Sequence, residues 1–153
     1  MSHINKQIRN VFATLVTGLA TTGANVFQDR NHPLAATDMP GLRVYVQDSQ
    51  LNDSLDTQST DAAAPFLQRR DINLVCECLA KTSSTMEDTL DEIALEVEKA
   101  IAANPLLGLA KLPSRLKNIQ TQVGYATDVA AGQATMNWHI TVFTMSNAPD
   151  VAV

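Results

Sequence analysis

Apolar residues recur with a helical period at the start of the chain. Over residues 3–17 they fall on one stripe at 3.6-residue spacing, which predicts an amphipathic helix. Ser2 is placed to cap its first turn, and Gly18 stands where a left-handed residue would end it. The stripe that this helix buries consists of Ile4, Ile8, Val11, Phe12, Leu15 and Val16.

The same period returns over residues 85–103 and predicts a second helix. Ser84 and Glu87 have the spacing of a capping box, and further acids follow in the first turns, where the helix dipole favours negative charge. Asn104-Pro105 ends the helix. Its apolar stripe consists of Leu90, Ile93, Ala94, Val97 and Ile101.

Apolar and polar residues alternate elsewhere, as they do in strands. In the strand predicted at 71–81, apolar Val75 and Leu79 also stand on the opposite face, which indicates burial on both faces. The last two strands flank a turn-like segment at 128–132 and predict an antiparallel hairpin. The predicted strands cover residues 24–28, 42–47, 71–81, 116–125 and 133–144.

The resulting order, α-β-β-β-α-β-β, predicts an α+β fold with a mostly antiparallel sheet and two main helices packed on one face. We expect one domain over residues 1–153, with a flexible loop at about 48–68 and a frayed tail at about 146–153. The loop segment carries four acids and no Lys or Arg, so we expect proteases to cut there first.

Composition narrows the class of protein. The 153 residues are 45% hydrophobic and 18% charged, with a net charge of −5. No window reaches the roughly 18 to 20 apolar residues of a membrane helix, and the polar start is unlike a secretion signal. We therefore expect a soluble protein with no membrane partner. The chain has no Lys/Arg cluster able to neutralise several phosphates, which argues against nucleic-acid binding as its main role.

Motifs for catalysis are missing or incomplete. Gly18–Gly23 has the glycine spacing of a phosphate loop, but it lacks the Lys and follows a helix. His139 is expected to be exposed or partly hydrogen-bonded on a polar strand face. His32, beside Asp29 and Arg30, indicates either a polar cluster or a structured turn. With no Gly-x-Ser-x-Gly segment either, we expect no enzyme, no catalytic residues and no cofactor.

Two cysteines, Cys76 and Cys78, share one face of a predicted strand. A zinc site needs four ligands, and His3, His32 and His139 lie in unrelated segments. We expect buried, reduced thiols in a cytosolic setting, and no metal site.

Several segments over nearly the whole chain carry a resemblance to a known family. They are the helix ending near Gly18, Thr22–Arg30, Pro40–Tyr45, Arg70–Leu79, the acidic helix with Asp88–Ala94 and Val97-Glu98, and the closing hairpin to Val142-Phe143. In these segments and in element order the chain resembles the tail terminator proteins of long-tailed bacteriophages, the minor tail protein U-like family.

The resemblance implies a structural virion protein whose protomers form a homo-hexameric ring. Such a ring caps the tail tube, stops its polymerisation and presents the surface for the head-tail connector protein. Its partners would be itself, the tail tube protein and the connector, while genomic DNA passes through the lumen without specific binding. The protein would lie at the head-proximal end of the tail, and in the host cytoplasm during assembly. The resemblance implies no catalytic residues.

Two alternatives remain open at this stage. A head-side adaptor, or head-tail completion ring protein, would share the ring but bind a different partner. An unrelated cytosolic binding module would instead be a monomer with a concave apolar pocket, and gel filtration would separate it from a ring.

A head-to-tail ring needs two complementary surfaces on each protomer. Residues 1–47 carry a net charge of +2, whereas residues 48–64 carry −4 and residues 82–103 carry −5. Opposite charges therefore predict the contact. The candidate interface residues are Arg9, Arg30, Arg43, Arg69 and Arg70 on one surface, and Glu87, Asp91 and Glu92 on the other.

Overall fold

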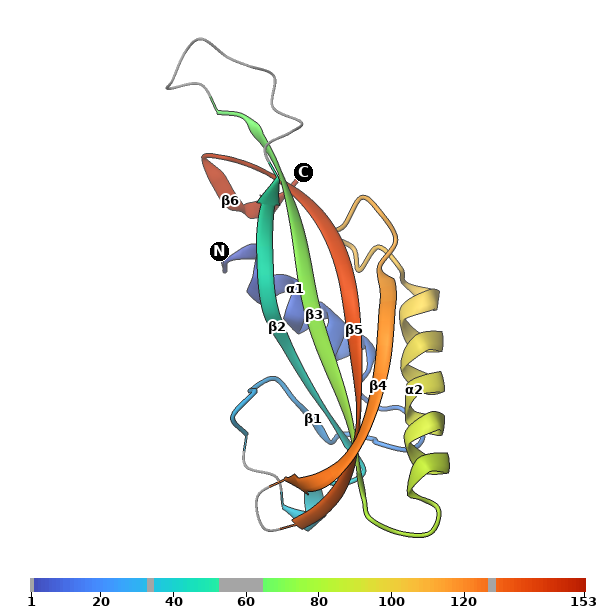
Figure 1. The fold of residues 1–153 in the computed structure, drawn as a ribbon. Coiled ribbons are helices and arrows are strands. Elements are labelled where there is room, and N and C mark those ends of the chain that lie inside the picture. The colour runs from blue at the N-terminus through green and yellow to red at the C-terminus, as the bar shows by residue number, and fades with distance from the viewer. Residues whose placement is uncertain (1, 33–34, 53–64, 127–128) are drawn as a thin grey trace.

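Two helices and a six-stranded sheet make up the fold. The computed structural model describes residues 2–32, 35–52, 65–126 and 129–153 (Figure 1). The helices are α1 (Ile4–Leu15) and α2 (Met86–Ala103), with a short 3-10 helix η1 (Ala36–Asp38). The strands are β1 (Val26–Phe27), β2 (Gly41–Asn52), β3 (Leu67–Lys81), β4 (Arg115–Ala126), β5 (Val129–Met145) and β6 (Ala148–Ala152).

The strands lie in the order β1-β2-β3-β5-β4, and β6 pairs with β5. All pairings are antiparallel except the short parallel contact of β1 with β2. The register places Val44 of β2 opposite Cys76 of β3, and Cys76 opposite Met136 of β5. Alternate residues of the three central strands therefore line the same face, and that face is apolar.

Both helices pack on this apolar face. Figure 1 shows α1 behind β2 and β3, whereas α2 lies toward β4. The apolar stripe predicted for each helix is largely buried against the sheet, because an amphipathic helix is stabilised mainly by packing that face. The α+β class, the mostly antiparallel sheet and the two helices on one face are as the sequence predicts. The largest fully buried side chains are Phe12, Ile4, Ile8, Leu42, Ile72, Leu74, Leu79, Leu90, Ile93, Ile101, Met136 and Ile140.

The central strands are longer than predicted. β2 continues to Asn52 and β3 starts at Leu67, so both ends of the predicted loop at 48–68 belong to strands. A bulge between Val46 and Asp48 places the side chains that follow on the opposite faces of the sheet. It therefore interrupts the apolar–polar alternation from which the strand is predicted. The middle of that loop, residues 53–64, lies outside the described residues. Of the predicted turn at 128–132, residue 128 also lies outside them, and residues 129–132 belong to β5.

The predicted helix caps are wrong at both N-termini. His3, not Ser2, caps α1, and its Nδ1 accepts a hydrogen bond from the Asn5 backbone N–H at 3.2 Å. The N-cap of α2 is Thr85 instead of Ser84, and its side chain makes no capping hydrogen bond. Each helix begins one residue later than the predicted cap requires, so Ser84 and Glu87 do not occupy the N-cap and N3 positions of α2.

The chain end is a strand and not a frayed tail. β4 begins opposite His139, so the last residues of β5 have no partner from β4. β6 occupies that edge, with Thr144 opposite Ala152 and Met145 opposite Ala148. The Gln7 side chain of α1 also donates to the Asp150 backbone oxygen at 2.6 Å, which fixes β6 beside the helix.

Candidate functional site

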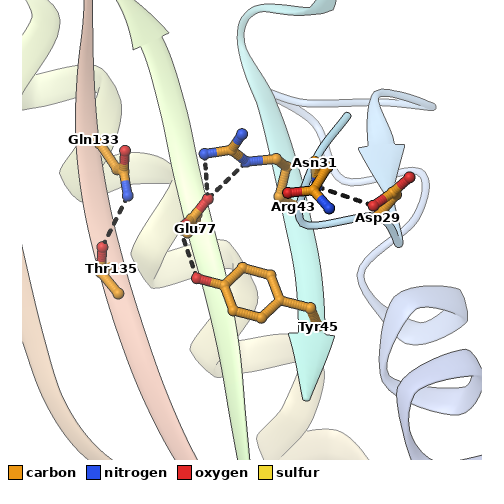
Figure 2. A network of polar contacts seen from close by, with 7 residues as sticks. All are labelled: Asp29, Asn31, Arg43, Tyr45, Glu77, Gln133 and Thr135. Atoms are coloured by element: carbon orange, nitrogen blue, oxygen red, sulfur yellow. Dashed lines mark hydrogen bonds and ion pairs between the residues drawn. The ribbon is translucent and has the colours of Figure 1, made fainter. Parts of the chain in front are cut away.

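The face of the sheet opposite the helices is polar and centres on a buried carboxylate. Glu77 on β3 is only 7% exposed. Its side chain accepts hydrogen bonds from Arg43 Nε at 2.6 Å and from the Tyr45 hydroxyl at 2.8 Å, both on β2 (Figure 2). These charge-assisted bonds compensate the burial of the carboxylate. The register explains the grouping, because Arg43 pairs directly with Glu77 across the two strands.

Tyr45 connects this carboxylate to the edge of the sheet. Its partial burial, together with the hydrogen bond to Glu77, raises its pKa to about 12. The guanidinium of Arg30 lies over the ring, 4.4 Å from the centroid, in cation–π geometry. Arg30 Nη2 also donates to the Val46 backbone oxygen at 3.4 Å. Arg30 is therefore held against β2 by two contacts.

An open pocket of about 450 Å³ lies on this polar face. Amide and hydroxyl groups dominate its walls, and Gln133 donates to Thr135 at 3.1 Å within it (Figure 2). Since the charge of Glu77 is offset by Arg43, the pocket offers mainly neutral hydrogen-bonding groups. Its lining residues are Arg30, Tyr45, Gln47, Val75, Glu77, Gln120, Gln122, Gln133, Thr135 and Asn137.

A second polar cluster surrounds Asp71 on β3. One carboxylate oxygen, Oδ1, lies 3.0 Å from Arg69 Nε, 3.1 Å from the Thr141 hydroxyl and 3.2 Å from His139 Nε2. His139, which is expected on a polar strand face, therefore has a polar partner there for its Nε2 atom, the Asp71 carboxylate. The cluster holds a carboxylate, an imidazole and the Thr141 hydroxyl, which donates to the carboxylate and not to the imidazole.

A basic pocket lies where α1 meets the β2 edge. It measures about 540 Å³ and contains three cations, Lys6, Arg9 and Arg30, against one acid, Asp29. Arg9 Nε donates to Gln28 at 3.3 Å, and the Asp29 carboxylate accepts the Asn31 backbone N–H at 2.9 Å. None of the three cations forms an ion pair with a described residue. We call this site the basic pocket; it is lined by His3, Asn5, Lys6, Arg9, Gln28, Asp29, Arg30, Asn31, Tyr45 and Val46.

The first turns of α2 carry the opposite charge. Four acids, Glu87, Asp88, Asp91 and Glu92, are exposed there, and we call them the acidic surface. In the part of the chain that is described, none of them is in an ion pair. Leu90, Ile93 and neighbouring apolar residues of the same helix are buried, so the acids necessarily face away from the sheet.

The structure separates the five predicted arginines. Arg9 and Arg30 line the basic pocket. Arg43 and Arg69 instead form ion pairs within the protomer, with Glu77 and Asp71. Arg70 is 7% exposed on the helix side of the sheet, where its Nε donates to Thr144 at 2.9 Å.

Burial lowers the pKa of the Arg70 guanidinium below its ordinary value. Of the five arginines, Arg9 and Arg30 therefore offer the most accessible charge. On the acidic side, Glu87, Asp91 and Glu92 all remain exposed, as an interface would require.

Sequence reasoning missed two groups at these sites. Lys6 lies one helical turn before Arg9, and their i, i+3 spacing on the polar face of α1 was a readable signal. The Glu77–Tyr45 contact had no such signal, because 32 residues separate the partners and only the strand register brings them together.

His32 and the two thiols occupy structural positions. The His32 ring stacks on Phe27 with 4.0 Å between centroids, and its Nε2 lies 3.5 Å from Asp38. The backbone N–H of His32 donates to the Asp29 carbonyl at 3.1 Å, as in the structured turn that the sequence allows, and the polar side chain beside its ring is Asp38 instead of the expected Asp29 and Arg30. Cys76 and Cys78 are buried and unbridged. A hydrogen bond with Cys78, together with burial, raises the pKa of the Cys76 thiol.

The described ranges also bear on metal and membrane binding. They contain no group of three His, Cys, Asp or Glu side chains able to hold a metal ion. No helix there has the length and apolar character needed to cross a bilayer. The strongest features for recognition are therefore the basic pocket, the acidic surface and the polar sheet face.

Comparison with known proteins gives a structural neighbour. No protein-family model matches the chain, and no curated protein matches it. A solved structure with a similar chain is the virion of a native gene transfer agent particle. The two chains share 16% sequence identity over 93% of this chain and 92% of the other, with a TM-score of 0.37.

Proposed function

We propose that this protein is a structural component of a phage virion, a tail terminator that forms a ring at the head-proximal end of the tail. The ring caps the tail tube, stops its polymerisation and provides the surface on which the head-tail connector docks. The proposal starts from the sequence resemblance, which implies an α+β protomer of this element order.

The observation that carries the proposal is the separation, on one protomer, of two oppositely charged surfaces whose side chains form no ion pair with a described residue. The basic pocket lies beside α1 and the β2 edge, whereas the acidic surface lies on the outer side of α2. A contact between two different surfaces repeats from copy to copy and forms a closed ring when the rotation between copies closes. A self-complementary surface would instead end at a dimer.

The net charge of −5 suits the proposed lumen. DNA is densely negative, and proteins that hold it do so with arrays of Lys and Arg. Two of the candidate arginines, Arg43 and Arg69, are already paired with carboxylates inside the protomer. Genomic DNA would then pass through the ring without specific binding.

The functional test is removal of this protein from the phage. Without a terminator, tube subunits continue to add, so we expect overlong tails together with heads that remain unjoined. Electron microscopy of the lysate measures both. Tails of normal length with unjoined heads would reject the terminator role and favour a head-side adaptor. A fully infectious particle would reject both roles.

A further inference from the structure

Both long edges of the sheet are open. β4 is the last strand on one side, and no strand in the described part of the chain pairs with its outer edge. On the other side, β1 pairs only with Leu42 and Arg43 of β2. The outer edge of β2 from Val44 to Leu51 therefore has no strand beside it within the described ranges. Backbone groups along both edges are available to a further strand, except the Val46 oxygen on β2, which accepts a hydrogen bond from Arg30 Nη2 at 3.4 Å.

Beyond the bulge between Leu116 and Asn118, the β4 edge lacks the features that prevent strands from associating. Lys117 lies at the bulge near its start, and the six residues that follow, Asn118 to Val123, are all uncharged. Ile119 is 42% exposed and Val123 is 63% exposed, because α2 packs over β3 and β5 and leaves β4 uncovered. Natural sheets protect such edges with charges, prolines or covering elements. An uncharged, partly apolar edge of this length is suited to pairing.

Strand direction determines how two edges of this sheet can meet. Three successive antiparallel pairings connect β2, β3, β5 and β4, so β4 runs antiparallel to β2. When copies are related by rotation about an axis parallel to the strands, β4 of one copy faces β2 of the next, and these strands are again antiparallel. The sheet then continues from copy to copy with its usual hydrogen-bonding pattern.

We propose that β4 of one protomer pairs with β2 of a second copy of this chain, and that this contact seats the acidic surface of α2 against the neighbour's basic pocket. Both helices lie on the same face of the sheet, with α2 toward the β4 edge and α1 toward β2. Continuation of the sheet therefore also continues the helix layer. Lys6 and Arg9 of the neighbour then meet acids that have no ion-pair partner within their own described protomer.

This inference rests on the proposed ring and specifies its contact. The charges select the neighbour and its register, since like charges facing each other disfavour other arrangements. The strand edges supply backbone hydrogen bonds, which do not depend on side-chain identity. Two kinds of variant therefore test the contact independently.

The first test exchanges the charges. One variant carries Lys6→Glu and Arg9→Glu, and the other carries Asp91→Lys and Glu92→Lys. Each variant alone places like charges across the contact, so light scattering should give the 16.5 kDa monomer where the wild type gives a larger assembly. An equal mixture restores opposite charges at every contact in an alternating ring, and the mass should return above that of a dimer. The matched control, Lys81→Glu with Lys111→Glu, reverses two exposed charges outside both surfaces and should assemble as the wild type does.

The second test charges the strand edge. Ile119→Lys with Val123→Lys places two cations on exposed positions of β4, so the fold should be retained while assembly is lost. Leu112→Lys, at a comparably exposed position outside the strand, should leave assembly intact. Circular dichroism confirms that each variant is folded.

The third measurement locates the contact directly. A carbodiimide joins an amine to a carboxylate only when the two touch, and mixing light and ¹⁵N-labelled chains marks the cross-links that join two copies. We expect mixed-isotope cross-links between Lys6 and the acids of α2. Three results would each overturn the proposal. The first is mixed-isotope cross-links found only between other residue pairs, and the second is a monomer at every protein and salt concentration. The third is assembly of either charge variant alone. If the expected cross-links form but phage lacking this protein still makes tails of normal length, the contact is retained and the terminator function is rejected.

Discussion

Arg43 and Glu77 form the closest ion pair in the described structure, with 2.6 Å between Nη2 and Oε2 and little exposure of either side chain. A buried charge left without its partner is strongly unfavourable, whereas replacing the whole pair with apolar groups costs much less. We therefore expect Glu77→Gln to lower the free energy of unfolding by about 3 kcal/mol. Urea denaturation of Glu77→Gln, Arg43→Met and the double variant Glu77→Met with Arg43→Met checks this. A double variant less stable than either single variant would contradict it.

Alkaline pH tests the environment of Tyr45. Its folded pKa of about 12 exceeds the ordinary tyrosine value of 10.0, so the folded state holds this proton more tightly than the unfolded state does. The contribution to stability is complete below pH 10 and is lost as pH rises toward about 12.

Tyr45→Phe removes the titrating group, so its stability should fall less steeply across this interval. The measurement is the urea midpoint at closely spaced pH values, with tyrosinate absorbance followed in parallel. Identical slopes for the two proteins would contradict the assignment.

Two glycines are expected to differ in their tolerance of a methyl group. A Cβ on Gly41 would overlap the Asp38 backbone oxygen, whereas a Cβ on Gly132 would overlap the Met86 side chain. A methionine side chain can move to another rotamer, but the backbone at Asp38 is held beside the β2 start. Overpacking typically lowers the free energy of unfolding by roughly 1–3 kcal/mol. We expect Gly41→Ala to lie at the upper end of this range and Gly132→Ala at the lower end. Thermal unfolding of both variants measures the difference in stability. Equal losses of stability would show that the Met86 side chain cannot move to another rotamer.

The buried thiols should be inert in the folded protein. Their burial and the raised pKa of Cys76 keep the thiolate scarce, and the thiolate is the reactive form. Alkylation should then proceed only as fast as the protein unfolds, and mild urea should accelerate it. Replacing both with Ala should lower stability by about 1–2 kcal/mol without preventing assembly. Stoichiometric zinc in the purified protein would contradict the structural role.

The sequence alone determined the two main helices, the strands other than β6, and most of their buried faces. The helical stripe from Ile4 to Val16 and the alternation from Ile72 to Ala80 are local periodicities, and a periodicity of apolar residues specifies which side of an element must leave water. Val75 and Leu79 on the second face of β3 are buried as predicted, because β3 is a central strand with neighbours on both sides.

The tertiary structure decided what lies across each strand and what covers it. Ile119 and Val123 alternate as a buried strand would, yet they are exposed, since the position of α2 over β3 and β5 leaves β4 without a cover. Register and packing likewise decide that Arg9 and Arg30 line the basic pocket, whereas Arg43 and Arg69 are ion-paired within the protomer and Arg70 is buried. Charge along the chain indicates which surfaces are possible. Only the pairing of strands distant in sequence determines which charges stay available to a partner, because an ion pair forms wherever the register brings two side chains within reach.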